Sequence, residues 1–318
     1  MDAAATNRGD YGDKGDEDRS MKTPSPIAAY WQATRAYSFP ASIVSVLLGT
    51  ALAARGYFGA PAQFEGLLLA LTLVGALLAQ AGGNVLNDYY DFVRGVDSRP
   101  DHGSGVLPQG LLTAPQMRRF GTLLLAGAGV CGIALLFLAR TENLFAVVVP
   151  LALLGLACAV LYTPVLKRYA LGDLVIMIAF GLGLTVGTYG VQTPLATTGQ
   201  LGLIALAALP VTLLVDAILH ANNMRDTQTD GASGVRTLAS LLGPQGSAAL
   251  QAVLLFGPVI LVLVLALLRI LPWTSLAVLL AVPVLIKAYR TGDVPFCAQA
   301  HLLFGLLYAL SVVVVPHP

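Results

Sequence analysis

In the sequence GLLLALTLVGALLAQAGGNVLNDYYD, residues 66–91, a long apolar run ends in a group of amide and carboxylate side chains. A helix needs roughly 20 mainly apolar residues to cross a bilayer, which is close to the length of this run. Asn84, Asp88 and Asp91 follow at positions i, i+4 and i+7, so on a helix they share one face. The stretch therefore predicts a membrane-spanning helix that presents carboxylates at one membrane surface.

The composition of the whole chain extends this pattern. Of its 318 residues, 56% are hydrophobic and only 11% are charged, and the mean hydropathy is +0.76. Soluble domains carry about 25% charged residues, so a soluble enzyme and a disordered chain are both disfavoured. The net charge of +1 gives no field that would attract a polyanion, so no nucleic-acid partner is expected. The chain is predicted to be an all-α polytopic membrane protein surrounded by the lipid bilayer.

Charged and Pro/Gly-rich breaks divide the chain into nine apolar stretches, each expected to be a transmembrane helix. Residues 1–24 are polar and contain six of the seventeen acidic residues, which predicts a disordered tail. Residues 25–318 are expected to form one transmembrane domain. The nine stretches cover approximately residues 38–55, 66–90, 117–139, 144–162, 171–191, 201–223, 247–268, 271–287 and 297–315.

The basic residues predict the orientation of these helices. With the amino terminus inside, the inner segments hold fifteen of the eighteen basic residues, and the outer segments hold only Arg55, Arg140 and Arg269. Cytoplasmic loops of membrane proteins carry an excess of Lys and Arg. We therefore expect a cytoplasmic amino terminus, an external carboxyl terminus and, as location, a bacterial inner (plasma) membrane.

The acidic residues indicate where the functional site lies. Outside the tail, seven of eleven acidic residues fall in two short windows, 88–101 and 216–230, at the cytoplasmic ends of the second and sixth stretches. In the second window Asn222, Asp226 and Asp230 have the spacing i, i+4, i+8. The pattern N-x-x-x-D thus occurs twice, 138 residues apart, which suggests an internal pseudo-repeat with two facing acidic sites. Carboxylates near a membrane are costly and usually functional.

Two groups of carboxylates that face each other repel, and a shared divalent cation removes that cost. Hard oxygen ligands without nearby cysteines suit Mg²⁺ rather than Zn²⁺. Because Mg²⁺ is usually held by one or two carboxylates together with phosphate oxygens, the expected ligand is a phosphate or diphosphate. The candidate catalytic carboxylates are Asp88, Asp91, Asp226 and Asp230, and these four together with Asp97 are the candidate metal ligands.

A diphosphate also needs polar and cationic partners from the protein. Arg225 lies inside the second motif, and Lys167 lies in the loop YTPVLKRYALGD, residues 162–173. Asn84 and Asn222 are expected to supply carbonyl oxygens or to donate to phosphate. The excess of basic residues in cytoplasmic loops would also place these cations here, and solvated carboxylates at helix ends are the corresponding structural alternative.

The motifs NDYYDFVRGVD (87–97) and NNMRDTQTD (222–230) resemble those of the UbiA superfamily of intramembrane prenyltransferases. The loop 162–173 and the segment FGLGLTVGTYGVQT (180–193) add to this resemblance, which covers roughly residues 28–315. Within that superfamily the two motifs are most similar to those of the menaquinone branch, which comprises the 1,4-dihydroxy-2-naphthoate polyprenyltransferases and their animal vitamin K2 relative. The resemblance implies nine helices around a central cavity, two Mg²⁺ ions bound through the diphosphate, and a Tyr162–Lys167 pair that contacts the diphosphate.

The expected function is therefore the Mg²⁺-dependent transfer of a polyprenyl group from an isoprenyl diphosphate to an aromatic acceptor. The first choice of acceptor is 1,4-dihydroxy-2-naphthoate, in menaquinone biosynthesis, and the alternatives are a hydroxybenzoate, homogentisate or a similar acceptor. From another class, a secondary transporter stays open because repeats and intramembrane acids occur there as well. A CDP-alcohol phosphotransferase also uses paired aspartate motifs, but its DGxxAR element is absent from this sequence.

Overall fold

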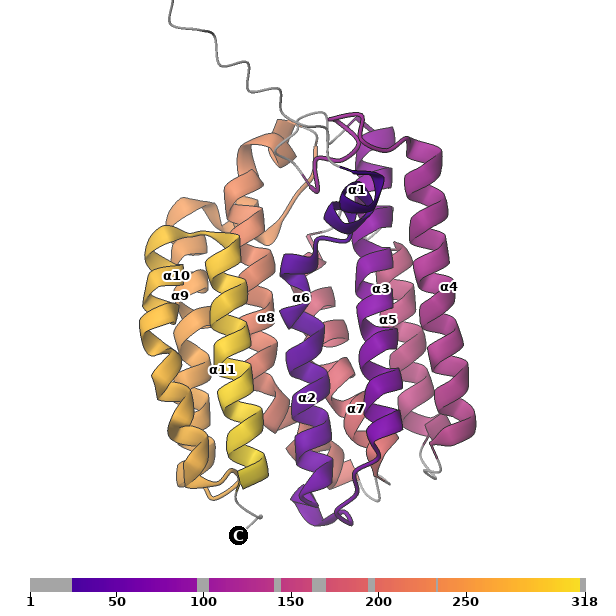
Figure 1. The fold of residues 1–318 in the computed structure, drawn as a ribbon. Helices are drawn as coiled ribbons and strands as arrows, with labels where there is room; N and C mark the ends of the chain where they lie inside the picture. The colour runs from indigo at the N-terminus through magenta and orange to yellow at the C-terminus, as the bar shows by residue number, and fades with distance from the viewer. Residues whose placement is uncertain are drawn as a thin grey trace, which may run out of the picture.

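The computed structural model describes residues 25–95, 103–139, 144–161, 170–193, 198–232 and 234–314. In these residues every regular element is a helix, and the long helices stand side by side in one bundle (Figure 1), so the predicted all-α class is confirmed. The tail 1–24 that was expected to be disordered lies outside the described residues.

The first part of the bundle contains three long helices and several short elements. The order is α1 (Pro26–Ala33), the 3₁₀ helix η1 (Ala36–Ser38), α2 (Pro40–Ala54), the 3₁₀ helix η2 (Tyr57–Gly59), α3 (Gly66–Val93) and α4 (Ala114–Leu138).

The second part continues with two π-helical segments and a further series of α-helices. The order is the π-helix η3 (Leu144–Val148), α5 (Val149–Leu161), α6 (Gly172–Ile176), the π-helix η5 (Met177–Gly183), α7 (Leu184–Gln192), α8 (Thr198–Ala232), α9 (Leu238–Leu267), the 3₁₀ helix η6 (Trp273–Ala281), α10 (Val282–Thr291) and α11 (Val294–Val314).

Among the described residues, seven helices are long and apolar enough to cross a membrane. The pair formed by residues 26–38 and α2 is bent by 55° and gives an eighth candidate. The fourth predicted stretch coincides with a shorter apolar helix, Phe145–Val160. The chain is an integral membrane protein, while the count of nine spanning helices stays a prediction.

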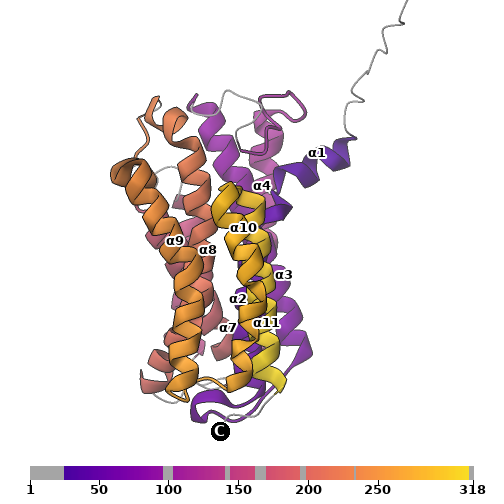
Figure 2. The same cartoon turned by 90° about the vertical axis from the view of Figure 1, so that its left-hand side faces the viewer.

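Residues with special backbone geometry mark the bends. Arg35 has φ +52°, in the left-handed region, where the chain turns from α1 into η1, and α1 projects from the upper end of the bundle (Figure 2). Gly243, with φ +68°, breaks α9 near its start and is followed by Pro244. Pro272 precedes the 3₁₀ helix η6, so the eighth predicted stretch is only partly α-helical.

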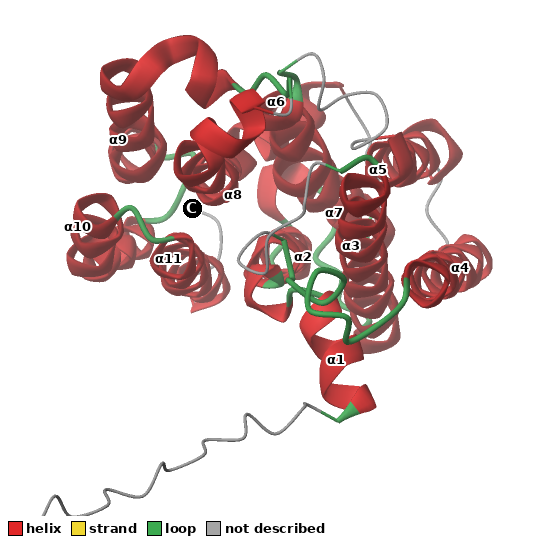
Figure 3. Ribbon diagram, turned by 90° about the horizontal axis from the view of Figure 1, so that it is seen from above, coloured by secondary structure: helices red, strands yellow, loops and turns green. Residues whose placement is uncertain are grey.

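Small residues set the closest contacts in the core. A Cβ atom built on Gly49 of α2 would lie 2.4 Å from the backbone oxygen of Thr185 in α7, and one on Gly305 of α11 would lie 2.2 Å from Val44 Cγ1. Glycine therefore permits α2 to lie against both helices. At one edge of the bundle (Figure 3), α4 buries only Met117 and Gly121 of its 25 residues, so its apolar surface faces lipid.

Candidate active site

A pocket lies between the two helices that carry the acidic motifs. Both α3 and α8 run upward in Figure 1, so both motifs lie at the same end of the bundle. The pocket is lined from both sides by an amide and a carboxylate: Asn87 and Asp91 from α3, and Asn222 and Asp226 from α8. The structure thus brings the two predicted motifs together around one cavity.

The register of the two motifs differs from the one that the sequence suggested. Asn84 also lines the pocket, but Asp88 is not among the lining residues. The equivalent pairs are Asn87–Asp91 and Asn222–Asp226, which are separated by 135 residues rather than the predicted 138. Sequence reasoning did not single out Asn87, although the spacing N-x-x-x-D also occurs at residues 87–91 and was the available signal.

Asp88 lies behind the pocket wall and has its own partners. Its side chain is buried, forms an ion pair with Arg35, and accepts a hydrogen bond of 3.0 Å from the backbone N–H of Ser104. It therefore joins α3 to the bend after α1 and to the loop before α4. Arg35, which lines the pocket, was counted in the sequence only as a basic residue, because no local pattern links it to Asp88, 53 residues away.

Three side chains of the second motif, on α8, form hydrogen bonds to one another. Arg225 donates from Nε to Asp226 Oδ1 and from Nη2 to Asp226 Oδ2, both at 2.7 Å. Arg225 Nη2 also donates to Asn222 Oδ1 at 2.8 Å, and Asn222 Nδ2 donates to Asp226 Oδ2 at 3.2 Å. The Arg225 side chain is 49% exposed, so a ligand that enters the pocket can reach its guanidinium group.

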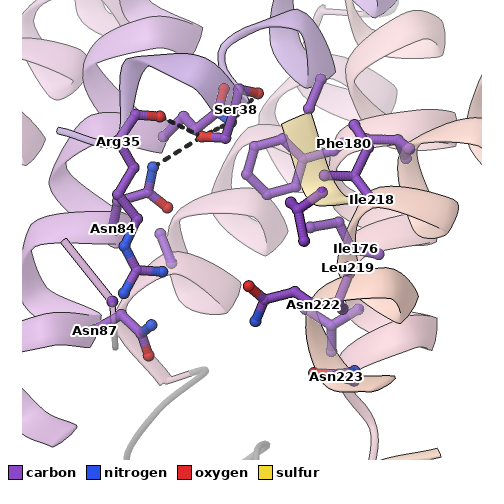
Figure 4. A pocket seen from close by; sticks show the side chains of 18 of the residues that line it. Arg35, Ser38, Asn84, Asn87, Ile176, Phe180, Ile218, Leu219, Asn222 and Asn223 are labelled. Atoms are coloured by element: carbon purple, nitrogen blue, oxygen red, sulfur yellow. Dashed lines mark hydrogen bonds between the residues drawn. The ribbon is translucent and has the colours of Figure 1, made fainter. Parts of the chain in front are cut away.

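A partly buried hydrogen-bond network forms the wall below the first motif. Gln80 Nε2 donates to the backbone oxygen of Ser38 at 2.8 Å and to Ser38 Oγ at 3.1 Å. Asn84 Nδ2 donates to Ser38 Oγ at 3.1 Å (Figure 4) and to the backbone oxygen of Thr34 at 2.9 Å. Gln80 was missed in the sequence, although its position four residues before Asn84 places it on the same helical face.

The opposite wall is apolar. Ile176 of α6, Phe180 of η5, and Ile218 and Leu219 of α8 line it (Figure 4). The extra residue of a π-helical turn is often found at functional sites, and here it lies in the segment that carries Phe180. Next to Phe180, a Cβ atom on Gly181 would lie 2.3 Å from Thr212 Oγ1, so glycine lets η5 pack closely against α8.

His220 connects three helices next to the second motif. Its Nδ1 lies 3.2 Å from Asp173 Oδ1 of α6, and its Nε2 lies 3.2 Å from the backbone oxygen of Ser247 in α9. Because a carbonyl oxygen only accepts, Nε2 carries a proton and donates to it. The imidazole is fully buried and does not line the pocket, so its role here is structural.

Comparison with known protein families identifies the fold and the type of reaction. Residues 42–314 match the UbiA prenyltransferase family. The chain belongs to this family. It is therefore an enzyme that transfers prenyl groups, and the resemblance of its two motifs to the UbiA superfamily is confirmed.

Relatives of this UbiA prenyltransferase occur in animals and bacteria. It is 34% identical to UbiA prenyltransferase domain-containing protein 1 of Danio rerio, over 93% of this chain and 87% of the relative, and 32% identical to the Homo sapiens protein of that name, over 91% and 84%. It is 31% identical to a 1,4-dihydroxy-2-naphthoate octaprenyltransferase of Haemophilus influenzae, over 91% of this chain and 96% of that enzyme.

Solved structures share the fold of this UbiA prenyltransferase. A UbiA homologue from Aeropyrum pernix K1 superimposes with a TM-score of 0.62 at 19% identity, covering 87% of this chain and 96% of that one. A UbiA homologue from Archaeoglobus fulgidus bound to GPP and Mg²⁺ gives a TM-score of 0.60 at 15% identity, covering 90% and 100%.

Four of the predicted site residues lie outside what the structure describes. Asp97, Tyr162 and Lys167 are not in the described segments, and for Asp230 only the helical backbone of α8 is described. Their roles as metal ligands or diphosphate contacts stay predictions.

Proposed function

We propose that this UbiA prenyltransferase transfers a polyprenyl group from an isoprenyl diphosphate to an aromatic acceptor in a Mg²⁺-dependent reaction, and that the acceptor is 1,4-dihydroxy-2-naphthoate. The observation that carries this proposal is the pocket between α3 and α8, into which Asp91 and Asp226 project from opposite walls.

The donor set at the pocket fits Mg²⁺ that binds together with a diphosphate. Among the residues that the structure describes, no three His, Cys, Asp or Glu side chains are close enough to hold a metal by themselves. Mg²⁺ is usually held by one or two carboxylates and completed by phosphate oxygens and water. Asp91 and Asp226, with Asp230, Asp88 and Asp97 as further candidates, would hold the ions. The solved Archaeoglobus fulgidus homologue with GPP and Mg²⁺ supports the same pairing.

Cationic and amide groups at the mouth of the pocket would bind the diphosphate. Arg225 is half-exposed beside Asp226, and Arg35 lines the same cavity. Lys167 and Tyr162 are proposed as additional contacts through their place in the family motif. Asn222 adds a polar group on the α8 side, where Arg225 and Asp226 hold its side chain in place.

In the proposed reaction the C–O bond between the prenyl carbon and the diphosphate breaks, and its electron pair leaves with the diphosphate. Bound Mg²⁺ supplies charge neutralisation for this leaving group. Arg225 and Arg35 add preorganised positive charge where negative charge develops. Ile176, Phe180 and Ile218 exclude water from the allylic cation. A ring carbon of the acceptor then forms the new C–C bond, and the ring loses a proton or, for the naphthoate, its carboxyl group as carbon dioxide.

The proposed acceptor rests on similarity to a relative, and the proposed side of the membrane rests on the distribution of basic residues. The Haemophilus influenzae relative is named a 1,4-dihydroxy-2-naphthoate octaprenyltransferase, and its similarity spans nearly its whole length. The excess of basic residues near the motifs supports a site that faces the cytoplasm. Because animal relatives are also found, the bacterial location stays a prediction.

The position of the site favours an enzyme over a transporter. The motifs lie at one end of the bundle, whereas transporter sites lie near the bilayer midplane.

The test is incubation of the purified protein in detergent with Mg²⁺, a labelled polyprenyl diphosphate and a panel of acceptors, with products identified by mass. The panel contains 1,4-dihydroxy-2-naphthoate, 4-hydroxybenzoate and homogentisate. We expect the prenylated naphthalene product, its loss on chelation with EDTA and its return on addition of Mg²⁺. A product with another acceptor only would refute the naphthoate assignment. Absence of any prenylated product, with solute movement driven by an ion gradient, would favour transport.

A further inference from the structure

The helices that carry the acidic motifs, α3 and α8, line the pocket with residues at matching depths. Both run in the same direction, and Asp91 on α3 corresponds to Asp226 on α8. Gln80 and Val215 each precede the aspartate of their own helix by eleven residues. At a rise of 1.5 Å per residue, both lie about 16 Å deeper than the carboxylates.

The α3 and α8 walls carry the same kinds of side chain near the mouth of the pocket and different kinds deeper in it. Asn87 and Asn222 are equivalent and both are amides, but at the next position inward Asn84 faces Leu219, and further in Gln80 faces Val215. Figure 4 shows Asn84 and Ser38 on one side and Leu219, Ile218 and Phe180 on the other. The α3 wall is therefore polar at a depth where the α8 wall is apolar.

The hydrogen bonds already made within the polar α3 wall determine which groups of a ligand it can still bind. Both N–H groups of Gln80 donate to Ser38, whose backbone oxygen can only accept, and this fixes the orientation of the amide. Gln80 Oε1 accepts one hydrogen bond, of 2.7 Å, from the hydroxyl of the buried Ser42. Because a carbonyl oxygen has two lone pairs, one remains available.

Ser38 and Asn84, the other two polar side chains described for this wall, also have no N–H or O–H group left to donate. Ser38 Oγ donates to the backbone oxygen of Arg35 at 2.9 Å and accepts from both Gln80 and Asn84, so its hydroxyl is fully used. Both N–H groups of Asn84 are donated, and its Oδ1 accepts no hydrogen bond from the described residues. Gln80, Ser38 and Asn84 together thus leave acceptors free and no donors, and at their depth they favour a ligand group that donates.

We infer that Gln80, oriented by Ser38 and Ser42 and assisted by Asn84, is a specificity-determining residue that accepts a hydrogen bond from a ring hydroxyl of the aromatic acceptor. This inference rests on the proposed prenyl transfer to an aromatic acceptor. A phosphate or carboxylate is disfavoured at this wall because it offers no proton. The prenyl tail is left to the apolar wall of Phe180, Ile218 and Val215 at the same depth.

The first experiment compares wild type with Gln80→Met, which has similar length and no hydrogen-bonding amide. We expect the KM for the naphthoate acceptor to rise about tenfold, the value of one hydrogen bond of about 1.4 kcal/mol, while the KM for the prenyl diphosphate stays unchanged. The matched control is Thr72→Val on α3, because Thr72 is buried outside the pocket and its hydroxyl donates to the backbone oxygen of Leu68. This control should change neither KM.

The second experiment modifies the acceptor, so it does not depend on a folded variant. The two mono-O-methyl ethers of the naphthoate are tested as substrates or competitive inhibitors of the wild type. One ether should bind about tenfold more weakly than the parent, and Gln80→Met should remove most of that difference. A purely structural role of Gln80 would not produce this dependence on one hydroxyl.

Two results would overturn the inference. One is equal binding of the parent and both ethers to the wild type. The other is a Gln80→Met variant that changes kcat or the KM for the diphosphate and leaves the acceptor KM unaltered. A wild type that prenylates no acceptor would refute the proposed function itself, which is a separate outcome.

Discussion

Asp91 on α3 and Asp226 on α8 occupy equivalent positions on two helices that run in the same direction, and both line one pocket at the same end of the bundle. They are 135 residues apart in the chain. Two carboxylates that line one cavity can share a divalent cation, which removes the repulsion between them. Their arrangement therefore links the pseudo-repeat in the sequence to the proposed metal-dependent chemistry.

Replacement of either carboxylate by its amide should disable turnover. We expect Asp91→Asn and Asp226→Asn to lower kcat by about 10²–10³-fold, because the amide keeps the shape and loses the charge that holds Mg²⁺. Product formation is measured over a Mg²⁺ titration. Glu65→Gln is the control, because Glu65 precedes α3 at the opposite end of the helix. Near-normal turnover in either aspartate variant would contradict the metal–diphosphate assignment.

The ion pair between Arg35 and the buried Asp88 should contribute to stability as a unit. Arg35→Ala leaves the buried Asp88 carboxylate without this ion pair, which costs about 3 kcal/mol. Asp88→Ala removes the same ion pair from the partly buried Arg35 and should also lower stability. The double variant should lose clearly less than the sum of the two single losses. Thermal unfolding in detergent measures all three, and additive losses would mean that the two side chains are not coupled. Turnover of Asp88→Ala separately tests whether this carboxylate also serves the reaction.

The contact between α2 and α7 should not tolerate a methyl group at Gly49. A Cβ there would meet the backbone oxygen of Thr185 at 2.4 Å, and such overpacking costs about 1–3 kcal/mol. Gly132→Ala on α4 is the matched control, since its Cβ would meet no atom within 4 Å. We expect a lower Tm for Gly49→Ala and an unchanged or higher Tm for Gly132→Ala. The reverse order would show that α2 and α7 are packed differently.

His220 should stabilise the junction of α6, α8 and α9. Removal of its side chain in His220→Ala leaves Asp173 and the backbone oxygen of Ser247 without this partner, which costs about 1–3 kcal/mol. A lower Tm with partial recovery in His220→Gln is the expected result, measured by thermal unfolding of the detergent-solubilised protein. If His220→Ala unfolds at the wild-type temperature, the imidazole does not hold these helices together.

Much of the architecture was predictable because it depends on local composition. Long apolar runs with charged breaks specify spanning helices, since the backbone must satisfy its own hydrogen bonds in lipid. The bend at Arg35, by contrast, depends on a left-handed backbone conformation that no glycine marks.

The site was predictable only in part. Helical spacing identified the acidic faces of both motifs, but two overlapping N-x-x-x-D patterns at residues 84 and 87 could not be distinguished by spacing alone. The structure places Asn87 and Asp91 at the pocket and turns Asp88 toward Arg35. Gln80 carried only a weak signal, because a single amide within an apolar run is also compatible with a structural role.

The amino-acid sequence alone is enough to specify a helical membrane protein with two acidic motifs at helix ends, because the cost of exposing backbone or charge to lipid acts on each segment separately. The packing of the helices sets which side of each motif lines the cavity, brings Arg35 to Asp88, and makes one wall polar and the other apolar. Those features depend on contacts between residues far apart in the chain, and the rotation of one helix against another is set by packing.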